Sequence, residues 1–322
     1  MCIRDSCEVL RVLAHGDPSV ALVSSMHPSV LAFWLATDDV PPPDDTAWRT
    51  QREAVFDTVE QGAWWGTITS EPGSGGDVSK SRATARRDGD GWLLSGQKHF
   101  GSGSGITSYM ITTAVPEGEE EPDWFYVATG ERPTDGSAGV TIAAPWDGQG
   151  MKATQSHALT FDDCPAVRFA WPGHLMDLVG AAAPFFGTLF TAVVLGVVET
   201  AVETARGQIL PKADALRAYE QVEWTQAEAE AWTIAQVYEG MLRAIESGQP
   251  AFGAALRGKM IAAQLAESVM LRLGRVLGGG TFSRRSPFGH WFEDVRALGF
   301  LRPPWGLASD AVFLDTLAPT VG

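Results

Sequence analysis

Three glycine-rich stretches hold the residues whose types and spacing best suit binding chemistry. The first, SEPGSGGD (70–77), follows the apolar run GAWWGTIT. The second, FGSGSG (100–105), ends an expected strand. The third, GGGTF (278–282), ends an expected long helix. Glycine lets backbone amides approach a ligand without a side chain in the way. Three such turns suit one large, flat, anionic ligand held between a β domain and a helical bundle. A flavin with its phosphates is such a ligand.

Neither these turns nor the histidines form a known catalytic or metal-binding motif. SEPGSGGD lacks the GK[ST] ending of a phosphate-binding P-loop, because Lys80 comes four residues after Gly76 and no helix follows. It also lacks the Rossmann spacing, since a strand and a hairpin are expected next. The six histidines form no HExxH motif and no i,i+4 pair, and no GxSxG elbow occurs. The spacing predicts no metal site, and SEPGSGGD on its own also fits a plain turn.

The composition is that of a globular protein with two or three sub-domains. The 322 residues are 45% hydrophobic and 20% charged, and the net charge is −15. Because no run of Lys and Arg is present, we expect no nucleic-acid partner. The cysteines are odd in number and form no CxxC, which favours a reducing compartment and predicts a cytoplasmic protein: Cys2, Cys7 and Cys164.

One apolar segment has the length of a membrane span. Residues 178–198 carry no charge over about 21 residues, which is what a bilayer needs. Pro184, three glycines and two threonines dilute this apolarity, and the amphipathic stretch ETAVETAR continues the helix. We therefore expect a helix buried on all sides and no membrane span.

The elements that must position the glycine-rich turns change type twice along the chain. Residues 7–62 are expected to be helical, with the leading MCIRDS outside the first helix and a loop at DDVPPPDD. Residues 63–171 read as short strands: WLLSGQKHF, SYMITTAV, DWFYVAT, VTIAA and ALTFDD. Helices return over 212–248, 252–277 and 306–317, with a short polar stretch before the last. This order predicts an α+β architecture.

Four segments, in this order, resemble the acyl-CoA dehydrogenases and their flavin-dependent relatives. They are GTITSEPGSGGDV, DGDGWLLSGQKHFGSGSG, DGQGMKATQSHALTFDD and RVLGGGTFSRRSPFGHWFEDVRA, and the likeness spans about residues 8 to 316. The resemblance implies a partial N-terminal helical domain over 7–62, a central β-barrel-like domain over 63–171, and a C-terminal four-helix-bundle domain over 172–322. Family members carry further helices before the first one here, so the resemblance also implies a shortened N-terminus.

The same resemblance implies FAD, or FMN, as the cofactor and names the residues that would hold it. The SEPG turn would wrap the ring and pyrophosphate with its amides, and Phe100 would stand where the family has a tryptophan against the ring. Ser102 would replace the threonine whose hydroxyl bonds flavin N5, since both side chains offer a donor. The full set of cofactor candidates is Thr69, Ser70, Gly75, Gly76, Phe100, Gly101, Ser102, Arg206, Gly278 and Gly279.

Dehydrogenation between Cα and Cβ of a substrate needs a carboxylate base for the α-proton. The resemblance places this group either near Arg302 or near Phe186 and Gly187, and neither position is acidic. Asp310 is the remaining candidate base, while Glu293 is expected to be a surface charge.

Two activities therefore follow from the resemblance. The first is an FAD-dependent oxidoreductase acting on the CH–CH group of an acyl-CoA or another small hydrophobic substrate, with an electron-transfer flavoprotein as partner. The second is a monooxygenase that takes reduced flavin from a separate reductase and needs a dry pocket rather than a base. A flavin-binding protein without turnover is a third possibility. Homo-oligomer formation is implied in each case.

Overall fold

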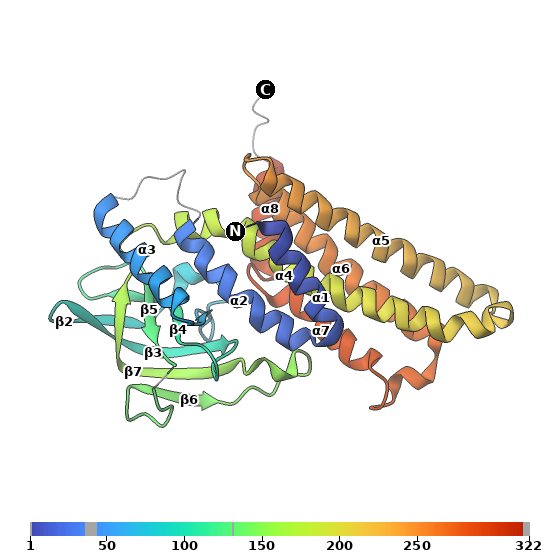
Figure 1. Ribbon diagram of the computed structural model, residues 1–322, viewed down its shortest axis with the longest axis horizontal. Helices are drawn as coiled ribbons and strands as arrows, with labels where there is room; N and C mark the ends of the chain where they lie inside the picture. Colours follow the sequence, from blue (N-terminus) through green and yellow to red (C-terminus); the bar gives the residue numbers. More distant parts are fainter. Residues whose placement is uncertain (1, 36–43, 131, 318–322) are drawn as a thin grey trace. The chain divides into compact units, whose positions relative to one another are not determined.

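The computed structural model describes residues 2–35, 44–130 and 132–317, and the chain divides into two compact units (Figure 1). The first, here called the β unit, contains Met26–Asp147 and Thr154–Ala183. The second, the helical unit, contains Met1–Ser25, Gly148–Ala153 and Pro184–Gly322. The predicted α+β class is confirmed. The expected loop at DDVPPPDD falls mostly outside the described residues.

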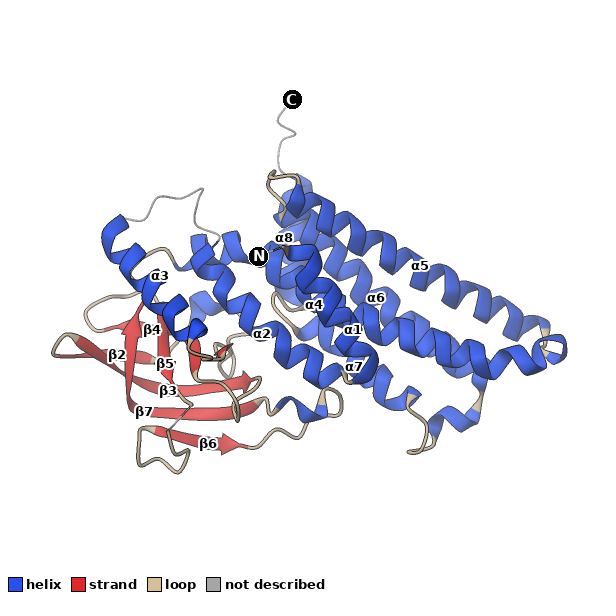
Figure 2. Cartoon of the chain, viewed as in Figure 1, coloured by secondary structure: helices blue, strands red, loops and turns tan. Residues whose placement is uncertain are grey.

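Seven strands form the sheet of the β unit, and five of them close into a ring (Figure 2). β4 pairs with β2, β2 with β3, β3 with β7, β7 with β5, and β5 returns to β4. β1 extends this ring on β4 and β6 on β7. The closed pairing makes a small barrel. The strands are β1 (Trp65–Thr67), β2 (Thr84–Asp88), β3 (Gly91–Gly101), β4 (Tyr109–Pro116), β5 (Asp123–Ala128), β6 (Val140–Ala144) and β7 (His157–Arg168).

Alternating side chains fill the barrel, because successive residues of a strand point to opposite faces. Trp92 and Leu94 on β3, and Phe125 and Val127 on β5, follow this period of two and are buried in one cluster. Gly96 lies where β3 comes closest to Ala83: a Cβ at Gly96 would sit 2.6 Å from the Ala83 Cβ, and its φ is +150°. Only glycine tolerates that combination of backbone and space.

An aromatic layer joins helices to the outside of this barrel. Within the β unit, Trp34 on α2 packs against Trp65 and Phe169 with ring centroids 5.3 and 4.5 Å apart. Trp48 on α3 stacks on Trp34 at 6.4 Å. Gln51 on α3 ties the helix to the chain after β7 by bonding the backbone of residues 168 and 170. These helices are α2 (Pro18–Leu35) and α3 (Asp45–Glu60).

The helical unit is built from long helices that approach each other at small residues. A Cβ at Gly196 of α4 would lie 2.3 Å from the Arg11 carbonyl oxygen of α1, and one at Gly258 of α6 would lie 2.4 Å from Met241 of α5. The helices can therefore come close only because these positions have no side chain. The remaining helices are α1 (Ile3–Gly16), α4 (Leu175–Ile209), α5 (Ala218–Glu246), α6 (Phe252–Leu277), α7 (Phe288–Phe300) and α8 (Trp305–Leu317).

Two expectations about these helices were wrong. Residues 3–6, expected to lie outside the first helix, form the first turn of α1, where Ile3 is buried and Arg4 bonds Glu239 at 2.7 Å and Glu246 at 2.8 Å. The stretch before α8, expected to be short and polar, contains the thirteen-residue helix α7.

A lysine is buried in the helical unit without a carboxylate partner among the described residues. Lys259 of α6 is 2% exposed, and its Nζ donates to the carbonyl oxygens of Leu301 at 2.9 Å and Pro303 at 2.8 Å. Leu301 is the C-cap of α7, so the amine occupies the carbonyl-rich end of that helix. Burial lowers the pKa of Lys259 to about 7, because the charged form loses its hydration.

Two helices, α2 and α4, are long and apolar enough to cross a membrane by length and composition. In the most apolar window of α2, 67% of the residues are buried inside the structure. In that of α4, 83% are buried. This matches the expectation that residues 178–198 form a buried helix.

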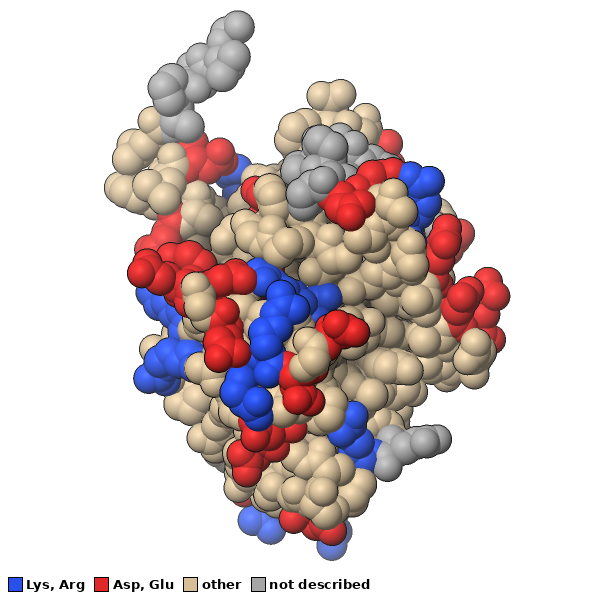
Figure 3. Space-filling view, turned by 90° about the vertical axis from the view of Figure 1, so that its left-hand side faces the viewer, with Lys and Arg blue, Asp and Glu red and all other residues tan. Residues whose placement is uncertain are grey.

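The surface around the β2–β3 hairpin carries charges of both signs. Figure 3 shows Lys and Arg side chains bordered by Asp and Glu on the side of the molecule where this hairpin lies. Arg86 pairs with Asp163 at 3.2 Å, and Arg168 pairs with Asp123 at 2.7 Å. This face therefore presents no continuous basic surface.

Candidate functional site

The first two glycine-rich segments lie side by side in the β unit. Ser70 and His99 form an isolated antiparallel bridge, and the His99 amide donates to the Ser70 carbonyl oxygen at 2.8 Å. A Cβ at Gly101 would lie 2.8 Å from Cδ1 of Ile68, two residues before Ser70. The chain segments 68–71 and 98–102 therefore lie side by side, as a shared ligand requires, with Phe100 as their exposed large side chain.

A buried ion pair that the sequence analysis did not identify stands behind this surface. Lys98 Nζ lies 2.5 Å from Glu71 Oε1, and the two side chains are 0% and 4% exposed. Ser81 Oγ donates to the same carboxylate at 2.6 Å. Burial opposes the ionisation of Glu71, but the hydrogen bonds from Lys98 and Ser81 outweigh it and hold the pKa of the carboxyl below its ordinary value.

The turn after Glu71 keeps its backbone accessible. Gly73, Gly75 and Gly76 all have positive φ, between 63° and 84°. Ser74 stabilises the turn by donating to the Glu71 carbonyl oxygen at 3.0 Å. Nothing lies within 4 Å of the position that a Cβ at Gly75 would take. The turn therefore leaves space beside the backbone at Gly75, while the Gly76 amide donates to Ser74 Oγ at 3.3 Å. Contact of Gly75 and Gly76 with a cofactor stays a prediction.

Phe100 is the most unusual residue of the second segment. Its φ is +60°, which a bulky residue adopts rarely and at a cost of about 1–3 kcal/mol. Phe100 is 59% exposed, and its ring meets the His99 and Trp146 rings edge to face, with centroids 6.2 and 6.1 Å away. A strained backbone that holds a large apolar ring in solvent is typical of a ligand-binding position.

Ser102 lies next to Phe100 and ends a chain of hydroxyl groups. Its Oγ is 2.9 Å from Ser156 Oγ, which is 2.7 Å from Thr154 Oγ1. All three side chains are buried. Each hydroxyl has one proton to donate. If Thr154 donates to Ser156 and Ser156 donates to Ser102, the Ser102 proton is left to donate to a ligand. Thr69 is buried just before Ser70.

Comparison with known proteins places this β unit in a family. Residues 66–164 match the family model "Acyl-CoA dehydrogenase, middle domain". A putative acyl-CoA dehydrogenase of Bacillus subtilis (strain 168) is 25% identical over 310 residues, covering 91% of this chain and 76% of that protein. The β unit therefore matches the middle domain of the acyl-CoA dehydrogenase family, and the chain is similar to acyl-CoA dehydrogenase-like flavoproteins. The predicted resemblance is thereby confirmed.

The proteins that this chain is similar to include enzymes with other named activities. Dibenzothiophene monooxygenase of Mycolicibacterium goodii is 27% identical over 249 residues, which is 73% of this chain and 52% of that protein. The solved structure of KijD3 in complex with FMN and a dTDP-linked sugar has a TM-score of 0.79 at 21% identity, covering 98% of this chain and 79% of that one. The chain thus spans about half the length of the monooxygenase that it matches.

The helical unit holds the other cofactor candidates of this acyl-CoA dehydrogenase-like chain. Gly278 caps α6 with a φ of +77°, and Gly279 begins a short 3₁₀ helix. Nothing lies within 4 Å of a Cβ built on either glycine. Both therefore present open backbone, and their contact with a cofactor stays a prediction.

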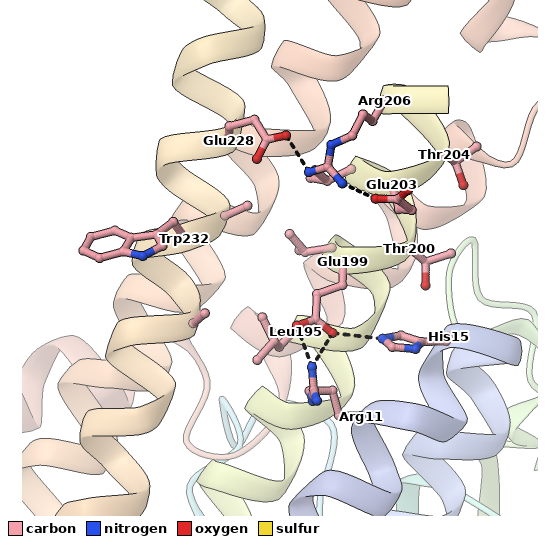
Figure 4. Close-up of a pocket in the computed structure, with 14 residues that line it drawn as sticks. Arg11, His15, Leu195, Glu199, Thr200, Glu203, Thr204, Arg206, Glu228 and Trp232 are labelled. Atoms are coloured by element: carbon pink, nitrogen blue, oxygen red, sulfur yellow. Dashed lines mark hydrogen bonds and ion pairs between the residues drawn. The ribbon is translucent and has the colours of Figure 1, made fainter. Parts of the chain in front are cut away.

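Arg206 stands at one end of a pocket of about 690 Å³ between α1, α4 and α5 (Figure 4). It pairs with Glu228 at 2.7 Å and with Glu203. At the other end, Glu199 pairs with Arg11 and His15. A phosphate would have to displace two carboxylates from Arg206. This ion-paired state therefore does not favour the predicted role of Arg206 in binding the cofactor.

The carboxylates near the expected base positions are held in other ways. Asp310 lies exposed on α8. Glu293 bonds Arg296 at 2.7 Å, and Asp294 accepts the Met151 amide at 2.6 Å. Burial raises the pKa of Asp294, with the Met151 amide opposing the shift. The role of Asp310 as a base therefore stays a prediction without geometric support.

Proposed function

We propose that this chain is a flavin-dependent oxidoreductase that holds FMN or FAD on the segments 69–76 and 100–102 of its β unit. The observation that carries this proposal is the bridge between Ser70 and His99, which brings the SEPG turn and the strained, exposed Phe100 onto one surface. FMN in the KijD3 structure supports a flavin of this kind.

The residues of this surface fit a flavin in shape and in hydrogen bonding. The empty space beside the Gly75 backbone leaves room for phosphate oxygens or the polar edge of the ring. Phe100 offers an apolar face to an aromatic ring, and the Ser102 hydroxyl offers one donor beside it. A bound flavin would supply the electron-transfer chemistry, which none of these side chains can perform.

For the reaction itself, we infer monooxygenation with reduced flavin delivered by a separate reductase. The positions near Arg302, Phe186 and Gly187 carry no carboxylate, so the base that dehydrogenation needs is missing there. The likeness to dibenzothiophene monooxygenase supports the same choice. Dehydrogenation of an acyl-CoA, with an electron-transfer flavoprotein as acceptor, is the second candidate, favoured by the match to the dehydrogenase middle domain.

An anaerobic titration separates the two reactions. Protein loaded with oxidised flavin is mixed with acyl-CoAs of several chain lengths, and the flavin absorbance is followed. We expect no bleaching, and we expect oxygen consumption that depends on an added hydrophobic substrate once a flavin reductase and NADH are supplied. Bleaching by an acyl-CoA would instead establish the dehydrogenase. Failure of the protein to take up either flavin would contradict both candidates.

Replacing Ser102 with alanine tests the hydroxyl beside Phe100. We expect flavin affinity to fall by about fivefold, because one hydrogen bond worth roughly 1 kcal/mol is lost. Fluorescence titration with FMN and FAD measures the effect. Ser104→Ala is the matched control, since the Ser104 hydroxyl donates to the Gly101 carbonyl oxygen at 2.5 Å within its own turn. Equal affinities for Ser102→Ala and the unaltered protein would remove the proposed role.

A further inference from the structure

The buried ion pair joins the two segments on which the proposed function places the flavin. Glu71 follows Ser70 directly, and Lys98 precedes Phe100 by two residues. The chain between them runs through β2 and most of β3, so no local structure sets their spacing. The 2.5 Å contact between Lys98 Nζ and Glu71 Oε1 is thus a long-range link placed directly behind the candidate site.

This pair is not a ligand site, because its hydrogen-bonding capacity is already used. Besides Glu71, Lys98 Nζ donates to the Thr113 carbonyl oxygen at 2.6 Å and to Ser81 Oγ at 2.9 Å. An ammonium group has three protons to donate, so these three acceptors satisfy it. Glu71 in turn accepts the backbone amides of residues 82 and 83 at 2.7 and 3.1 Å.

The directional bonds of this network fix backbone rather than only filling space. An apolar pair of similar volume would bury comparable surface, but hydrophobic contact is non-directional. Glu71 Oε1 accepts from Lys98 and from the Ala83 amide, and Oε2 accepts from the Arg82 amide, so the carboxylate links β3 to the chain leading into β2. Its position therefore determines where Ser70 and the turn begin relative to Phe100.

We propose that Glu71 and Lys98 are positioning residues that set the spacing between Ser70 and Phe100–Ser102 needed for flavin binding. This inference rests on the proposed function. It differs from a purely structural role, because a structural pair can be replaced by any well-packed pair, whereas a positioning pair cannot.

The experiment uses the double variant Glu71→Leu/Lys98→Met. An apolar pair in place of a buried ion pair commonly leaves a protein as stable as before. We expect its urea midpoint to fall less than that of Lys98→Met alone, because no buried charge is left unpaired although the amides of residues 82 and 83 lose their acceptor. Its affinity for FMN and FAD should fall by at least about tenfold. The absorption bands of bound flavin at saturation should shift as well. Unchanged affinity and unchanged bands in a folded double variant would overturn the inference.

A milder variant covers the case in which the double variant fails to fold. Ser81→Ala removes one hydrogen bond to each partner and leaves both charges in place. We expect several-fold weaker flavin binding, with a flavin spectrum that differs from that of the unaltered protein, and unchanged binding would overturn the inference. If the unaltered protein takes up no flavin while remaining folded, the proposed function itself fails, which is a distinct result.

Discussion

Replacing Lys98 alone with methionine is expected to lower the free energy of unfolding by about 3–5 kcal/mol, because it leaves a buried carboxylate without its cation. The Glu71 side chain is 4% exposed, and the carboxylate would keep Ser81, two backbone amides and the exposed Arg82 guanidinium at 3.9 Å. Urea denaturation followed by tryptophan fluorescence measures the change. Glu71→Gln should cost a similar amount, since it leaves the Lys98 ammonium unpaired.

Arg82→Met is the matched control for this prediction. Arg82 also reaches Glu71, at 3.9 Å, but its side chain is 71% exposed. An exposed ion pair contributes about 0–1 kcal/mol, so this variant should unfold close to the unaltered protein. Equal losses for Lys98→Met and Arg82→Met would show that burial does not govern the pair.

Lys259→Met is expected to abolish a rise in the free energy of unfolding between pH 7 and pH 10. The pKa of Lys259 is lowered to about 7 by burial, while an unfolded lysine titrates near about 10.4. Between these values the unfolded chain binds a proton that the folded chain does not. The free energy of unfolding should therefore rise by about 1 kcal/mol per pH unit from pH 7 towards pH 10. Below pH 7 both states are charged, and the slope vanishes.

The measurement is the difference in unfolding free energy between the unaltered protein and Lys259→Met across this range. That difference should change steadily with pH, whatever the cost of the lost bonds to Leu301 and Pro303 at any one pH. Lys212→Met, at an exposed lysine, serves as the control and should show no such trend. A flat difference for Lys259→Met would show that the amine stays charged throughout.

The sequence predicts the barrel strands better than the last helices. Strands β3 to β6 were located within a residue or two, because Trp92, Leu94, Phe125 and Val127 alternate inward as a half-buried strand requires. Helix α7 was missed, since glycines and a proline lie close to its start. In addition, its buried residues are widely spaced: Phe288, Val295, Leu298 and Gly299.

The candidate site was predictable only in its local parts. The glycine-rich turns and Phe100 stand out in the sequence because their chemistry is local. The Glu71–Lys98 pair spans 27 residues, and the Ser102–Ser156 pair spans 54, so neither partner could be assigned without the fold. One signal was available: Lys98 continues the inward alternation of Trp92 and Leu94, and a lysine at such a position requires a buried partner.

The closed ring of strands has a consequence for the behaviour of the chain in concentrated solution. A sheet that ends in a long free edge offers its unsatisfied amides and carbonyls to other molecules. Here β4–β5 pairing brings the sheet back on itself, and only the three-residue β1 and the five-residue β6 flank the ring in the part of the chain that the structure describes. Strands this short give an incoming chain little to template on, so the native β unit should resist edge-to-edge aggregation.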